Sequence, residues 1–317
     1  MGSPAENGVS MPDKILIVGS GALATLFAAR LSASGVQVSM LGTWQEGLSA
    51  LEQHGAVLVK QQGEQQAYPV HVLKSSSRPE KFLKILVLVK SWQTGRVASQ
   101  LPALLHQQGL ALTLQNGLGN RESLAQILGT DRVAQGVTIL GATLQGPGRV
   151  CLAGEGPLSL EAHPKLEPLA RMLSGAGFQV NIVSEASSLI WGKLVINSAI
   201  NPLSAVLRLT NGELLDHPTS RLLLADLASE TAAVAAAKGI SLPYPDPISA
   251  TEDVARCTSG NRSSMLQDVL RGAPTEIDAI SGAIVDLGKY LGVPTPFNAC
   301  MARLVQAITP LSSATLL

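Results

Sequence analysis

Apolar and polar positions occur in alternating blocks along the first half of the chain. Nearly continuous apolar runs at residues 14–18, 85–89 and 110–114 predict strands that are buried on both faces. Helical spacing follows the first run up to about Ala33 and returns at 44–54. Further strands are predicted at 36–41, 133–140 and 178–183. This βαβα order is typical of an α/β fold, with a doubly wound parallel sheet of the Rossmann type and helices on both faces.

Two sections interrupt this order, and the pattern changes after residue 184. Residues 56–72 and 141–161 predict short antiparallel strands joined by Gly-rich turns. From about Ser184 onward, apolar residues recur with the helical period. Breaks between these helices are expected at Asn211-Gly212, Pro243 to Pro247, Gly260, and Gly272 to Pro274. The domains predicted are a disordered tail at 1–13, a dinucleotide-binding Rossmann domain at 14–185, and an all-helical substrate-binding and catalytic domain at 186–317.

The composition excludes several classes of function. Hydrophobic residues make up 46% of the 317 residues and charged residues 15%, which is typical of a globular protein with a large core. With zero formal net charge and 3% aromatic residues, no nucleic-acid partner is expected. The three cysteines lie far apart without metal-ligand spacing, which favours a reducing compartment and no metal site. The first residues lack an apolar signal region, and Asp226 and Glu230 interrupt the run at 222–237, so we expect a soluble, cytoplasmic protein with no membrane partner.

A glycine-rich turn follows the first predicted strand and opens a helix. It matches the dinucleotide-binding pattern G-x-G-x-x-G/A with the residues Gly19, Ser20, Gly21, Ala22, Leu23 and Ala24. Gly19 would permit the tight turn, and Gly21 would let the backbone approach a pyrophosphate at the helix N-terminus. A plain tight turn is the alternative, but the position at the start of a βαβ unit favours cofactor binding.

Three further positions at predicted strand ends are candidates for the cofactor and the substrate. Thr43 follows the second strand, where neither an acid for NAD nor an arginine for NADP is found. Lys90 follows the strand at 85–89 and would place a positive charge near an adenosine phosphate, or it is an ordinary solvated lysine. Asn116 follows the next strand and would touch nicotinamide or substrate, although Asn-Gly is also a common turn.

A polar stripe marks a helix that otherwise has a buried pattern. Lys193, Asn197 and Asn201 are each four residues apart, so they share one helix face. A lysine on such a face can extend to water, and Asn201 before Pro202 can lie at a kink or helix boundary. Neither alternative explains why all three polar residues fall on the same stripe.

Two segments further on carry polar residues at predicted helix starts. Ser264 and Gln267 fit an S-x-x-Q capping box, and the same helix start would also suit a carboxylate ligand. Glu276 opens another helix, where a first-turn acid is favoured by the helix dipole. Residue types alone do not decide between the structural and the functional role at either position.

Several segments together resemble the ketopantoate reductase family, also called 2-dehydropantoate 2-reductases. The resemblance rests on GSGALA, VKSWQ, LQNG, WGKLVINSAINPLSA followed by LTNGELL, and SSMLQD followed by PTEID. These motifs occur in the order and spacing of the family from residue 14 to about 300. The two C-terminal motifs are specific, whereas GSGALA is shared by many dehydrogenases.

The resemblance implies an active site in the cleft between a Rossmann domain and a helical domain. It implies reduction of 2-dehydropantoate to pantoate by NADPH, with hydride transfer to the C2 carbonyl, on the route to pantothenate and coenzyme A. By motif position, Lys193 is similar to the catalytic lysine, Glu276 to its partner carboxylate near the cofactor, and Lys90 to a lysine that contacts the 2′-phosphate. Positions that hold substrate or nicotinamide are matched by Asn116, Asn197, Asn201 and Ser264.

The resemblance leaves three questions open. Thr43 stands at or beside the position where the family usually has an arginine for the 2′-phosphate, so NAD is an alternative to NADP. Other readings of the function are a reductase of another branched 2-keto acid or a non-catalytic dinucleotide-binding regulator. The second has little need for a proton donor such as Lys193. The alanine-rich helices after residue 219 would pack within the domain or form a homodimer face.

Overall fold

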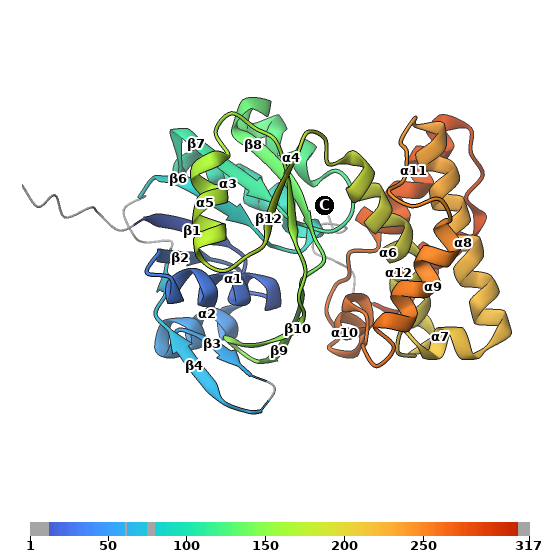
Figure 1. Cartoon of the computed structure of the whole chain (residues 1–317), viewed down its shortest axis with the longest axis horizontal. Coiled ribbons are helices and arrows are strands. Elements are labelled where there is room, and N and C mark those ends of the chain that lie inside the picture. Colours follow the sequence, from blue (N-terminus) through green and yellow to red (C-terminus); the bar gives the residue numbers. More distant parts are fainter. Residues whose placement is uncertain (1–12, 61, 75–79, 310–317) are drawn as a thin grey trace, which may run out of the picture.

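The computed structural model describes residues 13–60, 62–74 and 80–309, so the predicted tail lies outside the described residues except for Asp13. Strands alternate with helices up to Val183, and the described residues from Ser187 onward form helices without strands. In Figure 1 the part that contains the strands lies on the left and the helices of the second half lie on the right. The two parts are joined by contacts of Lys193, Asp268 and Glu276 with the first half.

The main sheet has eight strands in the order β12-β11-β8-β7-β6-β1-β2-β5. They are β1 (Lys14–Val18), β2 (Gln37–Leu41), β5 (His71–Val72), β6 (Phe82–Val87), β7 (Leu105–Thr113), β8 (Val133–Thr138), β11 (Leu158–Glu161) and β12 (Val180–Val183). All neighbours from β8 to β5 are parallel, which confirms the predicted fold class. Strand β11 runs antiparallel to β8, so the sheet is mixed at one edge.

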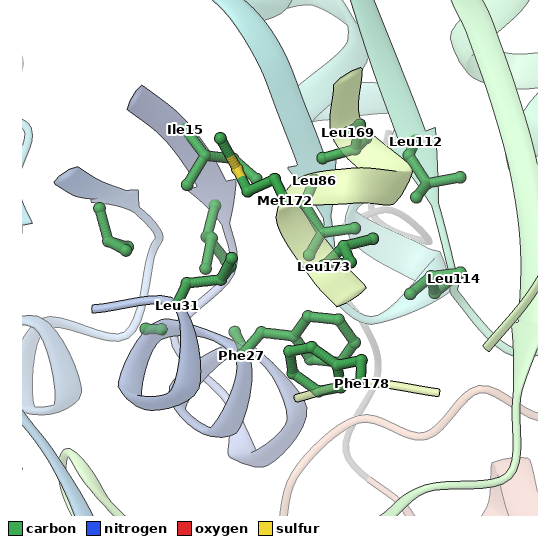
Figure 2. Packing of buried hydrophobic residues seen from close by; sticks show 14 of the residues in the cluster. Ile15, Phe27, Leu31, Leu86, Leu112, Leu114, Leu169, Met172, Leu173 and Phe178 are labelled. Atoms are coloured by element: carbon green, nitrogen blue, oxygen red, sulfur yellow. The ribbon is translucent and has the colours of Figure 1, made fainter. Parts of the chain in front are cut away.

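Helices cover both faces of this sheet because successive side chains of a strand point to opposite faces. On β1, Ile15 and Ile17 pack toward α1 (Ala22–Ala33) and α5 (Glu167–Gly175). Leu16 and Val18 pack toward α3 (Thr94–Leu104) and α4 (Asn120–Leu128) on the other face. Figure 2 shows the first of these cores, in which the rings of Phe27 and Phe178 stack with centroids 4.3 Å apart.

A second sheet of four strands covers the outer side of α1. Its strands are β3 (Ala56–Val59), β4 (Gln65–Tyr68), β9 (Gly141–Gly146) and β10 (Arg149–Gly154), in the order β4-β3-β10-β9. Helix α1 packs against β3, β9 and β10 as well as against the main sheet, so it is apolar around its whole circumference. The predicted antiparallel sections therefore form one small sheet, while β5 and β11 from the same sections join the main sheet.

The second half consists of helices packed around α6 (Ser187–Leu207), which contacts α8, α9, α10 and α12. These helices are α7 (Glu213–Asp216), α8 (Pro218–Ala237), α9 (Pro247–Cys257), α10 (Ser264–Leu270), α11 (Ala283–Leu291) and α12 (Pro296–Ile308). The predicted breaks between helices are confirmed. Of the two alternatives for Asn201, a kink or a helix boundary, the boundary is wrong, because α6 continues through Pro202 to Leu207. None of the described helices has both the length and the apolar composition needed to cross a membrane.

Candidate active site

The turn after β1 can be made only with glycine at its first position. Gly19 has φ +137°, and a Cβ on this residue would lie 2.9 Å from the backbone carbonyl of Leu88. The Gly19 amide donates a hydrogen bond to the carbonyl of Leu41 at 2.7 Å, which fixes the turn between β1 and β2. The turn therefore keeps its backbone close to the carboxyl edge of the sheet, where ligands bind in doubly wound folds.

The start of α1 has open space for an anion. No atom lies within 4 Å of the place where Gly21 would carry a Cβ, and this glycine is exposed. Gly21 is the N-cap and no side chain caps the helix, so the amides of the first turn, at Ala22 and Leu23, are not occupied by a capping side chain. Free amides and the helix dipole at an uncapped N-terminus favour a phosphate. These residues fit the pyrophosphate of a dinucleotide.

Two other residues of the glycine pattern have packing roles. Ala24 is fully buried, and its Cβ lies 3.3 Å from the Cβ position of Gly19, so its small size lets α1 approach the turn. Ser20 is 6% exposed and lies against Gly42. After β2, the hydroxyl of Thr43 accepts a hydrogen bond from Nε2 of Gln93 at 2.7 Å.

Lys193 lies on α6 where this helix passes the carboxyl end of β8. Its Nζ donates a hydrogen bond to the carbonyl of Thr138 at 2.7 Å. Burial lowers the pKa of Lys193 to about 8, and the negative charge of Glu276 opposes this shift only in part. Among the described residues, no ion pair joins Lys193 to Glu276. The two groups lie in one site, as expected, but they interact through space and not by direct contact.

Glu276 is held by the N-terminal half of the chain, although it belongs to the C-terminal half. It is 5% exposed, its Oε1 accepts from the amide of Ser91 at 3.1 Å, and its Oε2 accepts from Nδ2 of Asn116 at 3.1 Å. It lies in the bend before η3 (Asp278–Gly282), a π-helical turn of a kind frequently found at functional sites, whose cap is Ile277, so the prediction that Glu276 opens a helix is wrong. The fold thus brings together Asn116 and Glu276, which lie 160 residues apart.

Lys90 points toward two acids of the helical half. Its Nζ lies 2.6 Å from Oδ2 of Asp268 and 3.6 Å from Oε2 of Glu276. Burial alone would lower the pKa of Lys90, but the two carboxylates hold it above its ordinary value. Asp268 also pairs with Arg271 at 2.6 Å.

Asp268 is a residue of the site that the sequence analysis missed. It is 2% exposed, and it falls three residues after the buried Met265 on the inner face of α10. An acid on the apolar face of a short helix was the available signal, because buried acids are almost always paired. The identity of its partner, 178 residues away, has no local signal.

The remaining residues of the polar stripe follow α6 toward the start of α10. Asn197 is half-buried, and Asn201 is 7% exposed. One turn further, the Ser204 hydroxyl donates to Oγ of Ser263 at 2.7 Å, which ties α6 to the first turn of α10. The stripe therefore runs between the end of β8 and the beginning of α10.

The helix cap predicted at Ser264 is wrong by one residue, because the structure has it at Ser263. Oγ of Ser263 accepts the amide of Leu266 at 3.0 Å, so Ser263 is the capping residue. The side chain of Gln267 reaches back to the carbonyl of Arg262 at 3.0 Å. Ser264 is exposed in the first turn of α10, and its hydroxyl does not serve as the helix cap.

A cavity of about 480 Å³ adjoins the stripe. Lys193, Asn197 and Asn116 line it, whereas Glu276 and Ser264 do not. Its apolar walls include Leu118, Ile190, Trp191 and Leu194. The cavity therefore reaches the lysine and one asparagine of the stripe from the side of α4 and α11.

Comparison with known proteins identifies the family. The model of the ketopantoate reductase PanE/ApbA family matches residues 15–165, and the model of its C-terminal part matches residues 185–309. The chain belongs to the ketopantoate reductase family. It is therefore an oxidoreductase, and the resemblance stated from the sequence motifs is confirmed.

Relatives and solved structures extend the similarity to nearly the whole chain. A 2-dehydropantoate 2-reductase of Archaeoglobus fulgidus is 34% identical over 300 residues, which cover 93% of this chain and 97% of the relative. The crystal structure of a PanE/ApbA family ketopantoate reductase from Ralstonia eutropha is similar with TM-score 0.86 and 31% identity, covering 93% and 98% of the two chains. A structure of D-mandelate dehydrogenase with NADH and anilino(oxo)acetate is similar with TM-score 0.86, 28% identity and coverage of 93% and 97%.

Proposed function

We propose that the protein reduces 2-dehydropantoate to pantoate with a nicotinamide dinucleotide, on the route to pantothenate and coenzyme A. The observation that carries the proposal is the half-buried Lys193 at the carboxyl end of β8, with a lowered pKa, beside Asn116 and within the electrostatic influence of Glu276. The names of the relatives and the family membership support the same reaction. In this proposal the Rossmann domain, residues 14–185, holds the cofactor, and the helical domain, residues 186–317, supplies the proton donor.

The residues that would hold the dinucleotide are those of the glycine turn and the two adjacent strand ends. The uncapped start of α1 and the open space at Gly21 suit the pyrophosphate. Thr43 and Lys90 lie after β2 and β6, where we expect the adenosine phosphate to be recognised. When bound, the reduced cofactor supplies the hydride that adds to the C2 carbonyl. NADPH is the expected cofactor, with weak discrimination against NADH because no arginine accompanies Thr43.

Lys193 is the proposed general acid. Its pKa of about 8 leaves it mostly protonated at neutral pH, and close enough to neutrality to release its proton. An ammonium group has three donors, so Lys193 can keep its bond to the Thr138 carbonyl while it donates to the substrate oxygen. A fixed positive charge in a dry site also stabilises the negative charge that develops on that oxygen.

The other polar residues would bind and orient the substrate. In our proposal, Glu276 accepts a hydrogen bond from the substrate hydroxyl, and Asn116 sets the position of the Glu276 carboxylate. Asn197 and Asn201 extend the same stripe of α6 and orient the polar groups of the substrate. Ser264 lies in the first turn of α10, where a substrate carboxylate is favoured by the helix N-terminus.

A second candidate function is the reduction of another 2-keto acid. The cavity beside Lys193 has apolar walls and a volume of about 480 Å³, which leaves room for a larger apolar substituent. The similar D-mandelate dehydrogenase structure contains anilino(oxo)acetate, a 2-oxo acid derivative with an aromatic ring. These two observations favour a test of aromatic and branched 2-keto acids beside 2-dehydropantoate.

The experiment that tests both candidates is an oxidation assay with NADPH and NADH over a panel of 2-keto acids. We expect the highest kcat/KM with 2-dehydropantoate and NADPH. A higher kcat/KM with an aryl-substituted 2-keto acid would favour the second candidate. Measurable cofactor binding without oxidation by any 2-keto acid would contradict both and leave a dinucleotide-binding regulator.

A further inference from the structure

A chain of hydrogen bonds begins under the candidate site, at the end of β7. The hydroxyl of Thr113 donates to Oε1 of Gln115 at 2.9 Å. Nε2 of Gln115 donates to Oγ1 of Thr94 at 2.9 Å and also to the carbonyl of Val89 at 2.9 Å. The hydroxyl of Thr94 then donates to Oδ1 of Asn120 at 2.8 Å. The chain thus passes from the end of β7 to the first residues of α3 and α4.

The same chain continues into the site. Nδ2 of Asn120 donates to the backbone carbonyl of Asn116 at 2.9 Å. Nδ2 of Asn116 in turn donates to Oε2 of Glu276 at 3.1 Å. Successive bonds from Thr113 to Asn120 polarise one another. At Asn116 the series passes from the backbone carbonyl to the side-chain amide, so it acts on Glu276 by fixing the position of Asn116.

The inner members of the chain are buried. Thr94 is 3% exposed, Thr113 is 4% exposed and Asn120 is 7% exposed. A buried polar group without a partner destabilises the fold, so each member requires the next one to stay in place. The chain is therefore a fixed structure and not an arrangement of side chains that water could replace.

Helix capping does not explain why Thr94 and Asn120 are polar. These residues are the first of α3 and α4, but the caps of the two helices are Gln93 and Gly119, and no side chain caps either helix. Instead, the Thr94 hydroxyl donates a hydrogen bond to the Asn120 side chain, and the Asn120 side chain donates one to the backbone carbonyl of Asn116. Their hydrogen bonds thus serve the loop between β7 and α4.

This loop is docked closely on the helical half of the chain. Gly117 has φ +80°, and a Cβ on it would lie 2.4 Å from the carbonyl oxygen of Ala279. The amide of Leu118 donates to that same carbonyl at 2.9 Å. A shift of the Asn116 peptide would therefore change both this contact and the contact with Glu276.

We propose that Thr94 and Asn120 are positioning residues, which fix the Asn116 peptide so that its amide holds Glu276 in the orientation that the substrate requires. The role of Glu276 in turnover rests on the proposed function. The hydrogen-bond chain itself is a property of the fold and is testable without turnover.

The kinetic test uses isosteric variants. Thr94→Val removes one donor, and Asn120→Asp keeps the acceptor for Thr94 but cannot donate to the Asn116 carbonyl. We expect each to lower kcat about tenfold, the effect of one lost buried hydrogen bond, and to raise the KM for the 2-keto acid. Thr94→Ser restores the hydroxyl and should restore kcat. The dissociation constant of the cofactor should not change.

Two controls separate positioning from general stability. Ser220→Ala removes a buried hydroxyl that donates to the Leu214 carbonyl at 2.6 Å in the helical half, so it should lower Tm without lowering kcat. Ser123→Ala removes an exposed hydroxyl on the same helix as Asn120 and should change neither quantity. The proposal is overturned if Thr94→Val keeps wild-type kcat and KM, or if Thr94→Ser is impaired as strongly as Thr94→Val.

Amide hydrogen exchange distinguishes a failure of this proposal from a failure of the proposed function. The amide of Leu118 should exchange about tenfold faster in Thr94→Val and Asn120→Asp than in the wild type and in Thr94→Ser. If the wild type oxidises no cofactor with any 2-keto acid, the proposed function is wrong, and exchange alone then decides on positioning. Unchanged exchange at Leu118 in both variants would overturn the positioning role.

Discussion

Lys193 and Lys90 are both half-buried at the carboxyl edge of the main sheet, but their surroundings are opposite. Lys193 donates to a backbone carbonyl, has no acid in contact among the described residues, and has a pKa lowered to about 8. Lys90 lies 2.6 Å from Asp268 and 3.6 Å from Glu276, and its pKa is raised. Burial acts on both amines in the same direction, so the acids decide the difference.

The comparison assigns the two lysines different chemistry. A lysine with a pKa near 8 can give up its proton during turnover, which suits a general acid. A lysine that stays charged between two carboxylates suits the joining of the two halves of the chain, and it would bind a phosphate only in competition with Asp268 and Glu276. Removing Lys193 should therefore affect the chemical step, and removing Lys90 should affect binding.

The largest effect is expected for Lys193→Ala. This variant should lower kcat at least ~100-fold, the low end of general acid catalysis, because the substrate oxygen loses its proton donor. The dissociation constant of NADPH should stay near that of the wild type. Steady-state kinetics and a cofactor titration measure the two quantities.

Lys238→Ala is the matched control for this variant. Lys238 lines the same cavity but is exposed. If Lys193 alone donates the proton, kcat should be unchanged in Lys238→Ala. A loss of kcat in Lys238→Ala equal to that in Lys193→Ala would contradict the special role of Lys193. Near-normal turnover of Lys193→Ala would remove this residue from the mechanism.

The next effect is on stability. Burying a charged lysine whose pKa falls from 10.5 to about 8 costs up to about 3 kcal/mol below pH 8. Lys193→Met removes this cost but also the bond to the Thr138 carbonyl, which contributes about 1 kcal/mol. We therefore expect a free energy of unfolding about 2 kcal/mol higher than that of the wild type at pH 7.

The pH dependence of this gain has a defined sign. Between pH 8 and pH 10.5 the folded wild type releases the Lys193 proton before the unfolded chain does, so wild-type stability rises relative to Lys193→Met. Unfolding by denaturant at pH 7 and at pH 10.5 should show the gain at the first pH and its loss at the second. A gain that is independent of pH would mean that the charge of Lys193 carries no folding cost.

Local sequence patterns predicted the parts of the site that lie on one element. The four-residue spacing placed Lys193 and Asn197 on one face of α6, and the glycine pattern located the turn at Gly19. The partners of these residues could not be predicted, because they come from distant segments. Nothing in the local sequence shows which acids of the chain lie beside Lys90. The acceptor for Lys193 is a backbone carbonyl, which every residue type provides.

The neighbours of each strand in the two sheets also could not be predicted from the local sequence. Strand β3 pairs in parallel with β10, and β11 pairs antiparallel with β8. The sequence predicted only that 56–72 and 141–161 form short antiparallel strands. Alternation of side chains reveals which face of a strand is buried but not which strand lies beside it. The neighbours of these strands depend on tertiary contacts, such as the packing of α1 against β3, β9 and β10.

A smaller effect is expected for Lys90→Met, which tests the binding side of the comparison. If Lys90 recognises the 2′-phosphate, the KM for NADPH should rise about tenfold, the contribution of one charged hydrogen bond, while the KM for NADH stays unchanged. The kcat at saturating cofactor should change little, because Lys193 is intact.

Lys74→Met tests an alternative residue for recognition of the 2′-phosphate. Lys74 follows β5, the edge strand beside β2, and pairs with Glu52 on α2 (Gln45–His54) at 2.6 Å in an exposed position. An increase in the KM for NADPH in Lys74→Met, without an increase in Lys90→Met, would place phosphate recognition at the sheet edge. Lys90 would then serve only to join the two halves of the chain.

The smallest expected effect concerns Glu276, whose charge acts on both lysines. Glu276→Gln removes a charge that raises the pKa of Lys193, so the pH above which kcat declines should move down from about 8. Glu276→Asp keeps the charge and should leave the decline near pH 8.

Because both variants also lose substrate contacts, the pH at which kcat declines is compared and not the value of kcat. Lys90 keeps Asp268 at 2.6 Å and stays charged in either variant, so a downward shift reports Lys193 alone. A decline that stays at pH 8 in Glu276→Gln would contradict an action of the Glu276 charge on Lys193 and leave Asp268 as the acid that separates the two lysines.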